Sequence, residues 1–514
     1  MEDLQFIKSD SCSSHDLTYE YVFENEFIFG GPRCFSLPNF TVTVFLIPNA
    51  IELSLDSIID LENSVLGPYE GCVPPLTPPR LNHLLYYDTP LFDRQLLEME
   101  ALSNPRDLLT ASRPLLYTSA VVGLAPDCDV THLRTETSCV SRLKLAHTVL
   151  MTISVLSGFA GLITSRALYS YPYAIPTMSV TDVAVLSLAM ATSVVSLLAC
   201  ATYNRASVSR VFTGFQEIDR TLLDDAPRVY RSTVATQVVQ LCVVFSFLTL
   251  IFFYDNLLWY EGVLDRVVAV FAIYVVHTVN LVMVLQFVNL VTMLNHRTRR
   301  LNERLQSDEV FRDNPTAVKT VNGTSLDGNH VVFVQESVEI NLSQASRLRV
   351  LRGVHDRLGD IARRINVAYG VQILFDVTAS FVTLTTDVYF GVTFGEVISR
   401  SQQQGYGGTL DALLLSLCWI AMYVAKLTFV MGTCNASSAL DKQTLILVQK
   451  MMLREDVQAD VVAEAQMFAQ QVYACRFKFS AWGFFSLSYS TLCGIAGAVT
   501  MYLVILLQFQ QMTR

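Results

Sequence analysis

The sequence predicts an all-α membrane protein with seven transmembrane helices. Of its 514 residues, 52% are hydrophobic and only 16% are charged, whereas about a quarter of the residues in ordinary soluble domains are charged. Seven separate segments are also long and apolar enough to cross a bilayer, which takes about 20 helical residues. The expected spans are residues 143–169, 179–203, 231–260, 265–294, 368–394, 409–434 and 484–510.

An acidic segment, residues 1–106, precedes the spans. Its first 100 residues hold 16 Asp/Glu and 4 Lys/Arg, so the formal charge of −10 on the whole chain arises here. Because residues 67–79 are also rich in proline, we expect a mostly disordered segment. Its first thirty residues lack a basic start followed by an apolar core, so we expect no cleaved signal peptide. The remaining chain is nearly neutral, which gives no indication of nucleic-acid binding.

A short apolar patch, residues 114–126, lies just before the first span. It is too short to cross a bilayer, and we expect an interfacial or partly re-entrant helix there. Together with the first six spans it defines an expected region over residues 107–434, which includes a loose polar loop at 308–345. Residues 435–514 then form the remaining region, which ends in the seventh span.

The basic residues predict the orientation of the chain. The connections 204–230, 295–367 and 435–483 carry 4, 12 and 5 Lys/Arg, whereas the loops between them carry almost none. Cytoplasmic loops are the ones enriched in Lys and Arg. We therefore expect a multi-pass plasma-membrane protein with a cytoplasmic N-terminus and an extracellular C-terminus, inverted relative to G-protein-coupled receptors.

Apolar residues at helical spacing occur on two flanks of the spans. Such spacing predicts amphipathic helices that continue the membrane helices into the cytoplasm. Their apolar stripes need partners, so we expect a cytoplasmic anchor bundle; helices lying on the membrane surface are the alternative. The two stripes are Leu351, Val354, Leu358, Ile361 and Ile365, and Val461, Ala465, Phe468, Val472 and Tyr473.

The last span has a partly polar stripe. Tyr502 and Phe509 are seven residues apart, which is nearly two turns, so both face one way, with Ile505 and Gln508 beside them. One interpretation is a pore shared by several copies, in which Gln508 and Phe509 form a polar collar and an apolar constriction. The other is helix–helix packing with an interfacial glutamine, and the residues alone favour it.

Polar and aromatic residues in several spans predict a pocket for a small polar ligand. Sugars are bound by hydrogen-bonding groups and by aromatic faces, and an ionisable group inside a span is a functional candidate. The alternatives are belt tryptophans, a histidine satisfied within the bundle and threonines bonded to their own helix. The candidates are Trp259, His277, Asn280, Thr386, Asp387 and Trp419.

The closing region of the chain resembles that of the insect gustatory receptors. Residues 477–489 and 494–510 match its pattern, in which a Thr-Tyr pair, five apolar residues and Gln-Phe end the last helix; Met501 stands in place of the usual threonine. The stretch from Ala498 to Gln510 is similar to the fructose-responsive branch.

This resemblance implies a homotetrameric, ligand-gated, nonselective cation channel that passes monovalent and divalent cations. In that family the last helices line a central pore within the membrane lipid, and the cytoplasmic extensions form a shared anchor. The resemblance also implies that a sugar, fructose in this branch, binds between tryptophans at positions that match Trp259 and Trp419.

Two other functions stay open. One is a receptor-channel of the same family for another tastant, such as a polyol or a bitter compound. The other is a secondary carrier, which is disfavoured because all sixteen prolines lie outside the expected spans, and carriers often use interrupted helices. We expect continuous helices instead. No nucleophile–base pair, metal-ligand cluster or phosphate loop indicates an enzyme, a metal site or a cofactor.

Overall fold

The computed structural model describes residues 105, 107–124, 138–169, 176–223, 225–259, 270–307, 344–400, 407–454 and 457–513. All of them belong to one compact unit, residues 98–514. The predictions of a disordered segment over residues 1–106 and of a loose loop over 308–345 fall almost wholly outside the described residues; residues 344–345 already belong to a helix.

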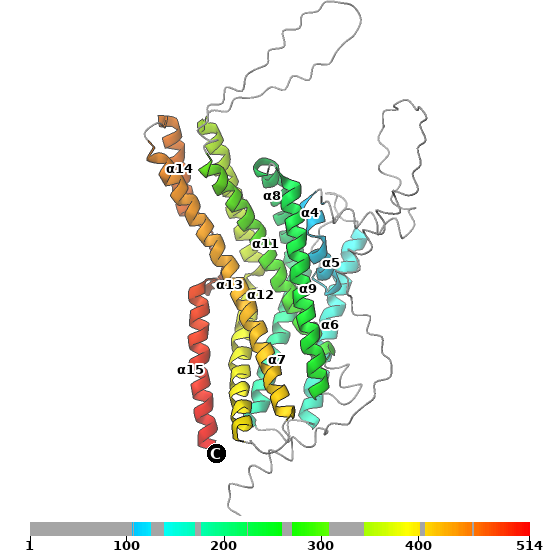
Figure 1. The fold of residues 1–514 in the computed structure, drawn as a ribbon. Helices are drawn as coiled ribbons and strands as arrows, with labels where there is room; N and C mark the ends of the chain where they lie inside the picture. Colours follow the sequence, from blue (N-terminus) through cyan, green and yellow to red (C-terminus); the bar gives the residue numbers. More distant parts are fainter. Residues whose placement is uncertain are drawn as a thin grey trace, which may run out of the picture. The chain divides into compact units, whose positions relative to one another are not determined.

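The described chain is built almost entirely of helices, which run largely side by side (Figure 1). In chain order they are α4 (Leu108–Ala111), α5 (Arg113–Val121), α6 (Ser138–Tyr169), α7 (Pro176–Ala199), η2 (Cys200–Asn204), α8 (Arg205–Leu222), α9 (Ala226–Trp259), η3 (Val270–Tyr274), α11 (Val275–Gln306), α12 (Gln344–Arg400), α13 (Gly407–Met452), α14 (Ala459–Ala474) and α15 (Tyr489–Thr513). Two short strands, β1 (Ser480–Ala481) and β2 (Phe485–Ser486), pair between α14 and α15.

Seven helical segments are long and apolar enough to cross a membrane, as the sequence predicts. Four of them, of 44, 35, 50 and 43 residues, greatly exceed the length that a bilayer requires. The surplus forms helical extensions of the apolar segments. The seven segments are Arg142–Leu168, Ser179–Leu222, Ala226–Asn256, Ala272–Gln306, Gln344–Thr393, Leu410–Met452 and Tyr489–Gln508.

The patch before the first span packs into the helical bundle. Asp107 caps α4 by accepting a hydrogen bond from the Thr110 backbone N–H at 2.8 Å. The Gln286 amide of α11 donates to Ser119 Oγ at 2.7 Å and to the Leu124 carbonyl at 3.0 Å. Ser119 is fully buried. The expected helix is present as α5, and it lies against α9 and α11.

Two π-helical turns occur in described helices that otherwise run without a break. The turn η2 joins α7 to α8, and η3 opens α11 immediately before Val275. The positions of the prolines could not predict these turns, because a π-turn widens a helix without needing proline or glycine. Such turns are frequent at functional sites.

The helical extensions gather at one end of the bundle (Figure 1). We call this part the extension bundle and define it as α8, α14 and residues 294–306, 344–368 and 434–452 of α11, α12 and α13. The predicted stripes are buried there, except Tyr473, which is 71% exposed and lies beside Arg476. The extensions thus pack against one another, as predicted for an anchor. The buried stripe residues are Leu351, Val354, Leu358, Ile361, Ile365, Val461, Ala465, Phe468 and Val472.

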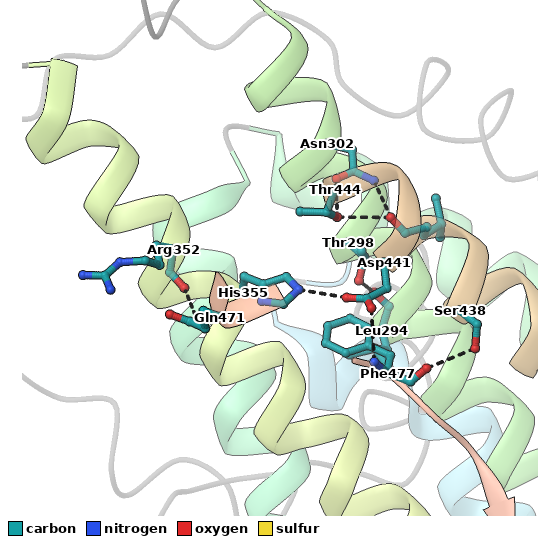
Figure 2. Close-up of polar contacts among 11 residues, drawn as sticks. Leu294, Thr298, Asn302, Arg352, His355, Ser438, Asp441, Thr444, Gln471 and Phe477 are labelled. Atoms are coloured by element: carbon teal, nitrogen blue, oxygen red, sulfur yellow. Dashed lines mark hydrogen bonds and ion pairs between the residues drawn. The ribbon is translucent and has the colours of Figure 1, made fainter. Parts of the chain in front are cut away.

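One carboxylate in the extension bundle joins three segments (Figure 2). Asp441 of α13 accepts a hydrogen bond from His355 Nε2 of α12 at 2.9 Å and another from the Phe477 backbone N–H at 3.3 Å. The Phe477 ring stacks on the His355 ring, with centroids 5.1 Å apart. The segment that leads from α14 to α15 is therefore attached to both α12 and α13.

Asparagines set the register of α11 against α13. Asn295 Nδ2 donates to the Thr433 carbonyl at 3.1 Å, and Asn302 Nδ2 donates to the Leu440 carbonyl at 3.0 Å. Each asparagine contacts a residue 138 positions further along the chain. Because this separation is the same for both contacts, the two helices run parallel over this stretch. Thr444 reinforces the pairing by donating to Asn302 Oδ1 at 2.6 Å (Figure 2).

A tight hairpin delays the start of the last span. The turn between β1 and β2 places Trp482 at φ 48° and Gly483 at φ 83°, a region that residues other than glycine rarely adopt. A Cβ on Gly370 of α12 would lie 3.2 Å from the Trp482 nitrogen, so glycine permits this close approach. The last helix consequently begins at Tyr489 rather than near residue 484.

A buried ion pair fastens α8 to α11. Arg297 donates to both carboxylate oxygens of Asp219, at 2.9 and 2.7 Å, and the two side chains are 1% and 3% exposed. Tyr230 of α9 donates to the same carboxylate at 3.0 Å. The guanidinium also lies 5.0 Å from the centre of the Phe215 ring. Three helices are therefore held by one bidentate pair.

Replacing Arg297 by alanine should destabilise the protein strongly. The change leaves the Asp219 carboxylate buried without its cation, which typically costs about 3–5 kcal/mol. The apparent Tm of the detergent-purified protein, followed by fluorescence-detected size exclusion, measures the loss. Arg300→Ala is the matched control, because Arg300 forms an exposed pair with Glu303. Equal losses in the two variants would contradict the assigned role of Arg297.

Candidate ligand and pore sites

An aromatic cluster lies where α11 meets α13. The His277 ring of α11 is 4.8 Å from the Trp419 ring and 6.4 Å from the Tyr423 ring. Trp419 and Tyr423 are one turn apart on α13, and their rings stack at 6.2 Å. The structure thus brings together two predicted site residues, His277 and Trp419. Tyr423 was missed, although its spacing of four from Trp419 could have indicated it.

An ion pair lies one turn further along α13. Lys426 Nζ is 2.8 Å from Asp376 Oδ1 of α12, and the two side chains are 7% and 2% exposed. The same ammonium lies 4.6 Å from the centre of the Tyr423 ring, which is a cation–π distance. This pair was also missed in the sequence, because nothing in either local pattern shows that the two spans meet there. It orients Tyr423 and closes one side of the aromatic cluster.

Asp387 of α12 contributes an acidic group to this region. Its Oδ2 atom is buried and has no hydrogen-bond partner among the described residues. Its backbone carbonyl accepts a hydrogen bond from the Ser416 hydroxyl of α13 at 2.9 Å. Thr386 is buried in the same turn of α12. A buried acceptor without a partner is costly, and a ligand hydroxyl would satisfy it.

Two predicted site residues are not part of this arrangement. Asn280 Nδ2 donates to the Ala189 carbonyl at 3.0 Å, and Asn280 Oδ1 lies 2.8 Å from the Ser193 hydroxyl. Its amide therefore packs α11 against α7, which is a structural role. Trp259 is the last residue of α9, and its side chain lies outside the described residues.

Carboxylates tie the helices together at the end opposite the extension bundle. The Tyr254 hydroxyl of α9 donates to Asp411 Oδ1 of α13 at 2.6 Å. The Tyr274 hydroxyl of η3 donates to Asp255 of α9. These bonds place α9 beside the helices that carry His277 and Trp419. The sequence did not single out Asp255 or Asp411 because each lies next to the end of an apolar run.

The last helix, α15, has one face without a partner in the single chain. None of the residues in its apolar window is buried. Tyr502 contacts Phe381 of α12, with ring centroids 5.8 Å apart, yet remains 52% exposed. Gln508, Met501 and Val504 are exposed. Gln508 lies about 120° around the helix from Tyr502, at roughly 100° per residue.

The structure therefore refines the predicted stripe of α15. Tyr502 lies at the border between the face packed on α12 and the exposed face, instead of in the middle of one shared stripe. Ile505 is half-buried and lies about 60° around the helix from both Tyr502 and Gln508, and Gln508 is exposed. The Phe509 side chain lies outside the described residues.

The fold and its seven candidate membrane helices are those of a polytopic membrane protein, and comparison with known proteins identifies the family. Residues 112–513 match the model of the 7tm chemosensory receptor family. The match covers most of the chain, and the chain belongs to this family. The resemblance found in the closing region is confirmed at that level.

Relatives and solved structures agree with this assignment. The chain is 27% identical over 237 residues to the gustatory receptor for sugar taste 43a of Drosophila melanogaster, covering 42% of this chain and 53% of that protein. It is 28% identical over 177 residues to the gustatory receptor for bitter taste 66a of the same organism, covering 32% and 30%. These matches span about half, or less, of the relatives' length.

The fold is also that of an insect olfactory receptor. The structure of OR5 from Machilis hrabei superposes with a TM-score of 0.52 at 14% identity, over 77% of this chain and 97% of that one. Its complex with eugenol gives a TM-score of 0.54 at 13% identity, over 78% and 98%. At such low identity the similarity establishes the fold alone.

The buried pair of Lys426 and Asp376 should be tested by a double-mutant cycle. Asp376→Asn or Lys426→Met alone leaves one buried charge unpaired and should lower the apparent Tm, at a cost of about 3–5 kcal/mol. The double variant should recover much of this loss, because neither charge then remains. Additive losses in the double variant would show that the two side chains are not coupled.

Proposed function

We propose that this protein is a gustatory receptor that acts as a ligand-gated, nonselective cation channel opened by a small sugar, with fructose as the first candidate. The observation that carries the proposal is the aromatic cluster of His277, Trp419 and Tyr423 between α11 and α13, with an unpartnered carboxylate oxygen of Asp387 on the adjoining helix α12. The match to a gustatory receptor for sugar taste supports the choice of ligand.

The chemistry of the cluster suits a sugar. The faces of Trp419 and Tyr423 would cover the C–H surface of the ring, and the unsatisfied Asp387 Oδ2 would accept a hydroxyl hydrogen bond. His277 can donate or accept, depending on its tautomer. Thr386 and Trp259 would complete the pocket. Asn280 would act indirectly, by holding α11 against α7.

The same helices offer a route from ligand to pore. Both α12 and α13 contact α15, and Phe381 of α12 touches Tyr502. A ligand that binds more tightly when α12 and α13 approach each other would favour the position of α15 that accompanies this approach. The difference in affinity between the two states supplies the energy of opening.

We further propose that four copies assemble as a homotetramer around the exposed face of α15. In that arrangement Gln508 would form a polar ring, with Phe509 and Ile505 as the apolar constriction and Tyr502 supporting the helix from its packed side. Monovalent and divalent cations would pass, and membrane lipid would surround the assembly. The basic connections favour a plasma-membrane orientation with the N-terminus in the cytoplasm and the C-terminus outside.

Two other functions are weaker candidates. A polyol or bitter tastant would use the same cluster, and the chain is also similar to a gustatory receptor for bitter taste. A secondary carrier would require stoichiometric uptake of solute without channel-like current. The spans lack the proline-interrupted helices that carriers often use.

A panel of sugars applied to cells that express the chain alone should evoke cation current in whole-cell recordings. Trp419→Ala should raise the half-maximal sugar concentration about tenfold, which corresponds to a loss of about 1.4 kcal/mol of stacking. Phe253→Ala is the control, because Phe253 is 65% exposed on α9. No current from surface-expressed protein across sugars and polyols would refute the sugar-gated channel.

Gln508→Ala should change single-channel conductance or basal leak while leaving the half-maximal ligand concentration nearly unchanged. The amide lies on the exposed face of α15, remote in sequence and in packing from the aromatic cluster. Leu250→Ala on α9, where Leu250 is 59% exposed, is a matched control for a membrane-facing change. If the conductance of Gln508→Ala equals that of the control, Gln508 does not line the pore.

A further inference from the structure

A groove of about 600 Å³ runs along the surface between α11 and α13 and reaches the first residue of α15. Its volume is in the range of ligand-binding cavities, roughly 300–1,000 Å³. It is separate from the aromatic cluster, because it involves neither His277 nor Trp419. Among the residues that line it are Asn295, His296 and Arg299 of α11, Ala425, Gly432, Thr433, Ala436 and Leu440 of α13, and Tyr489 of α15.

The two ends of the groove differ in chemistry. Asn295 and Asn302 contact Thr433 and Leu440, so His296 and Arg299 lie at the level of residues 433–440, where the extension bundle begins. The other end is formed around Ala425, deep in the span. From Ala425 to Leu440 the helix rises about 22 Å, at roughly 1.5 Å per residue.

Small residues on α13 leave space for the groove. Ala425 and Ala436 present little side chain, and a Cβ on Gly432 would lie 3.0 Å from the Tyr489 hydroxyl. Glycine thus lets Tyr489 lie directly on α13 and close one side. The result is a narrow, mainly apolar channel along the helix with polar groups at one end.

The polar end carries the positive charge of Arg299, with the His296 imidazole beside it, and no carboxylate is among the described residues that line it. The neighbouring arginines are occupied elsewhere, since Arg297 binds Asp219 and Arg300 pairs with Glu303. Asn295 Oδ1 is buried without a partner among the described residues. This end therefore has positive charge and an unused acceptor.

We propose that the groove binds one anionic phospholipid. The phosphate would lie against Arg299 and His296, a head-group donor such as an ammonium would reach Asn295 Oδ1, and an acyl chain would follow α13 towards Ala425. The length agrees, because half of a bilayer with its head groups is roughly 20–22 Å thick. The orientation proposed above places this end in the cytoplasmic leaflet, which carries the anionic lipids. Only this last point rests on the proposed function.

The bound lipid would also contact the last helix, α15. Tyr489 is the first residue of α15, and its ring forms one wall of the groove. A lipid in the groove would fill the space beside Tyr489 and hold the base of α15 against α13. The groove is thus a place where membrane composition acts on the last helix.

Native mass spectrometry of the purified protein tests the proposal, with phosphatidylserine and phosphatidylcholine of identical acyl chains and with glycerophosphoserine, which has none. Phosphatidylserine should be retained, and Arg299→Ala should weaken this binding about fivefold, as expected for one arginine near the head group. Arg300→Ala should leave it unchanged. The proposal would be overturned if phosphatidylserine and phosphatidylcholine bound equally well. It would also be overturned if Arg299→Ala and Arg300→Ala weakened the binding of phosphatidylserine to the same extent.

A second pair of variants tests the apolar end. Ala425→Phe should fill the groove and reduce retention of phosphatidylserine, whereas Ala439→Phe, on the same helix but outside the groove lining, should not. Retention of glycerophosphoserine as strongly as the intact lipid would show a free-phosphate site and would overturn the acyl-chain part. A cross-link from a cysteine placed at 425 to a neighbouring subunit would show that protein occupies the groove, which would also overturn the proposal.

Discussion

The parallel pairing of α11 with α13 is the constraint on which the rest of the structure depends. The described part of α11 within its span is mostly buried, at 83% of its apolar window, so it has partners on nearly every side. Asn295 and Asn302 fix its register against α13 through backbone carbonyls. With the helices in this register, His277 lies close to Trp419, 142 residues further along the chain, and Arg299 lies beside the small residues of α13 at the other end. A shift of one turn would separate both pairs.

Buried polar groups specify this arrangement more than they stabilise it. Arg297 with Asp219, Lys426 with Asp376, and His355 with Asp441 each join different helices. Removing such charges from water is costly, and their mutual attraction does little more than offset that cost. Two helices with purely apolar surfaces could pack in several registers, whereas each of these polar pairs can form in only one register of its two helices.

The last helix differs from the others in how it is held. The segment before it is attached to α12 and α13 through Asp441 and the stacked rings of His355 and Phe477. The hairpin at Trp482 then packs closely against Gly370 of α12. Beyond Tyr489, α15 touches α12 and α13 along one side only, and its other side is exposed. A helix fixed at its base and loosely packed along its length is suited to move as a unit.

The sequence by itself determined the class of the protein. Runs of apolar residues predicted seven spans, and helical spacing predicted the buried stripes of α12 and α14, because burial in a lipid or a helical core imposes a local periodicity. The closing motif of residues 494–510 indicated the family. Tyr473 was misjudged because α14 ends at Ala474, and spacing says nothing about where a helix loses its partner.

Only the tertiary structure decided which polar residues meet. It joined His277 to Trp419 and added Tyr423, Lys426 and Asp376, while it assigned Asn280 to packing against α7. It also divided the α15 stripe between a packed face and an exposed face. These outcomes depend on contacts between residues far apart in the chain, and on π-turns that rotate one helix face relative to the next. Local sequence patterns record how far a residue prefers to be buried, but not which distant residue it will face.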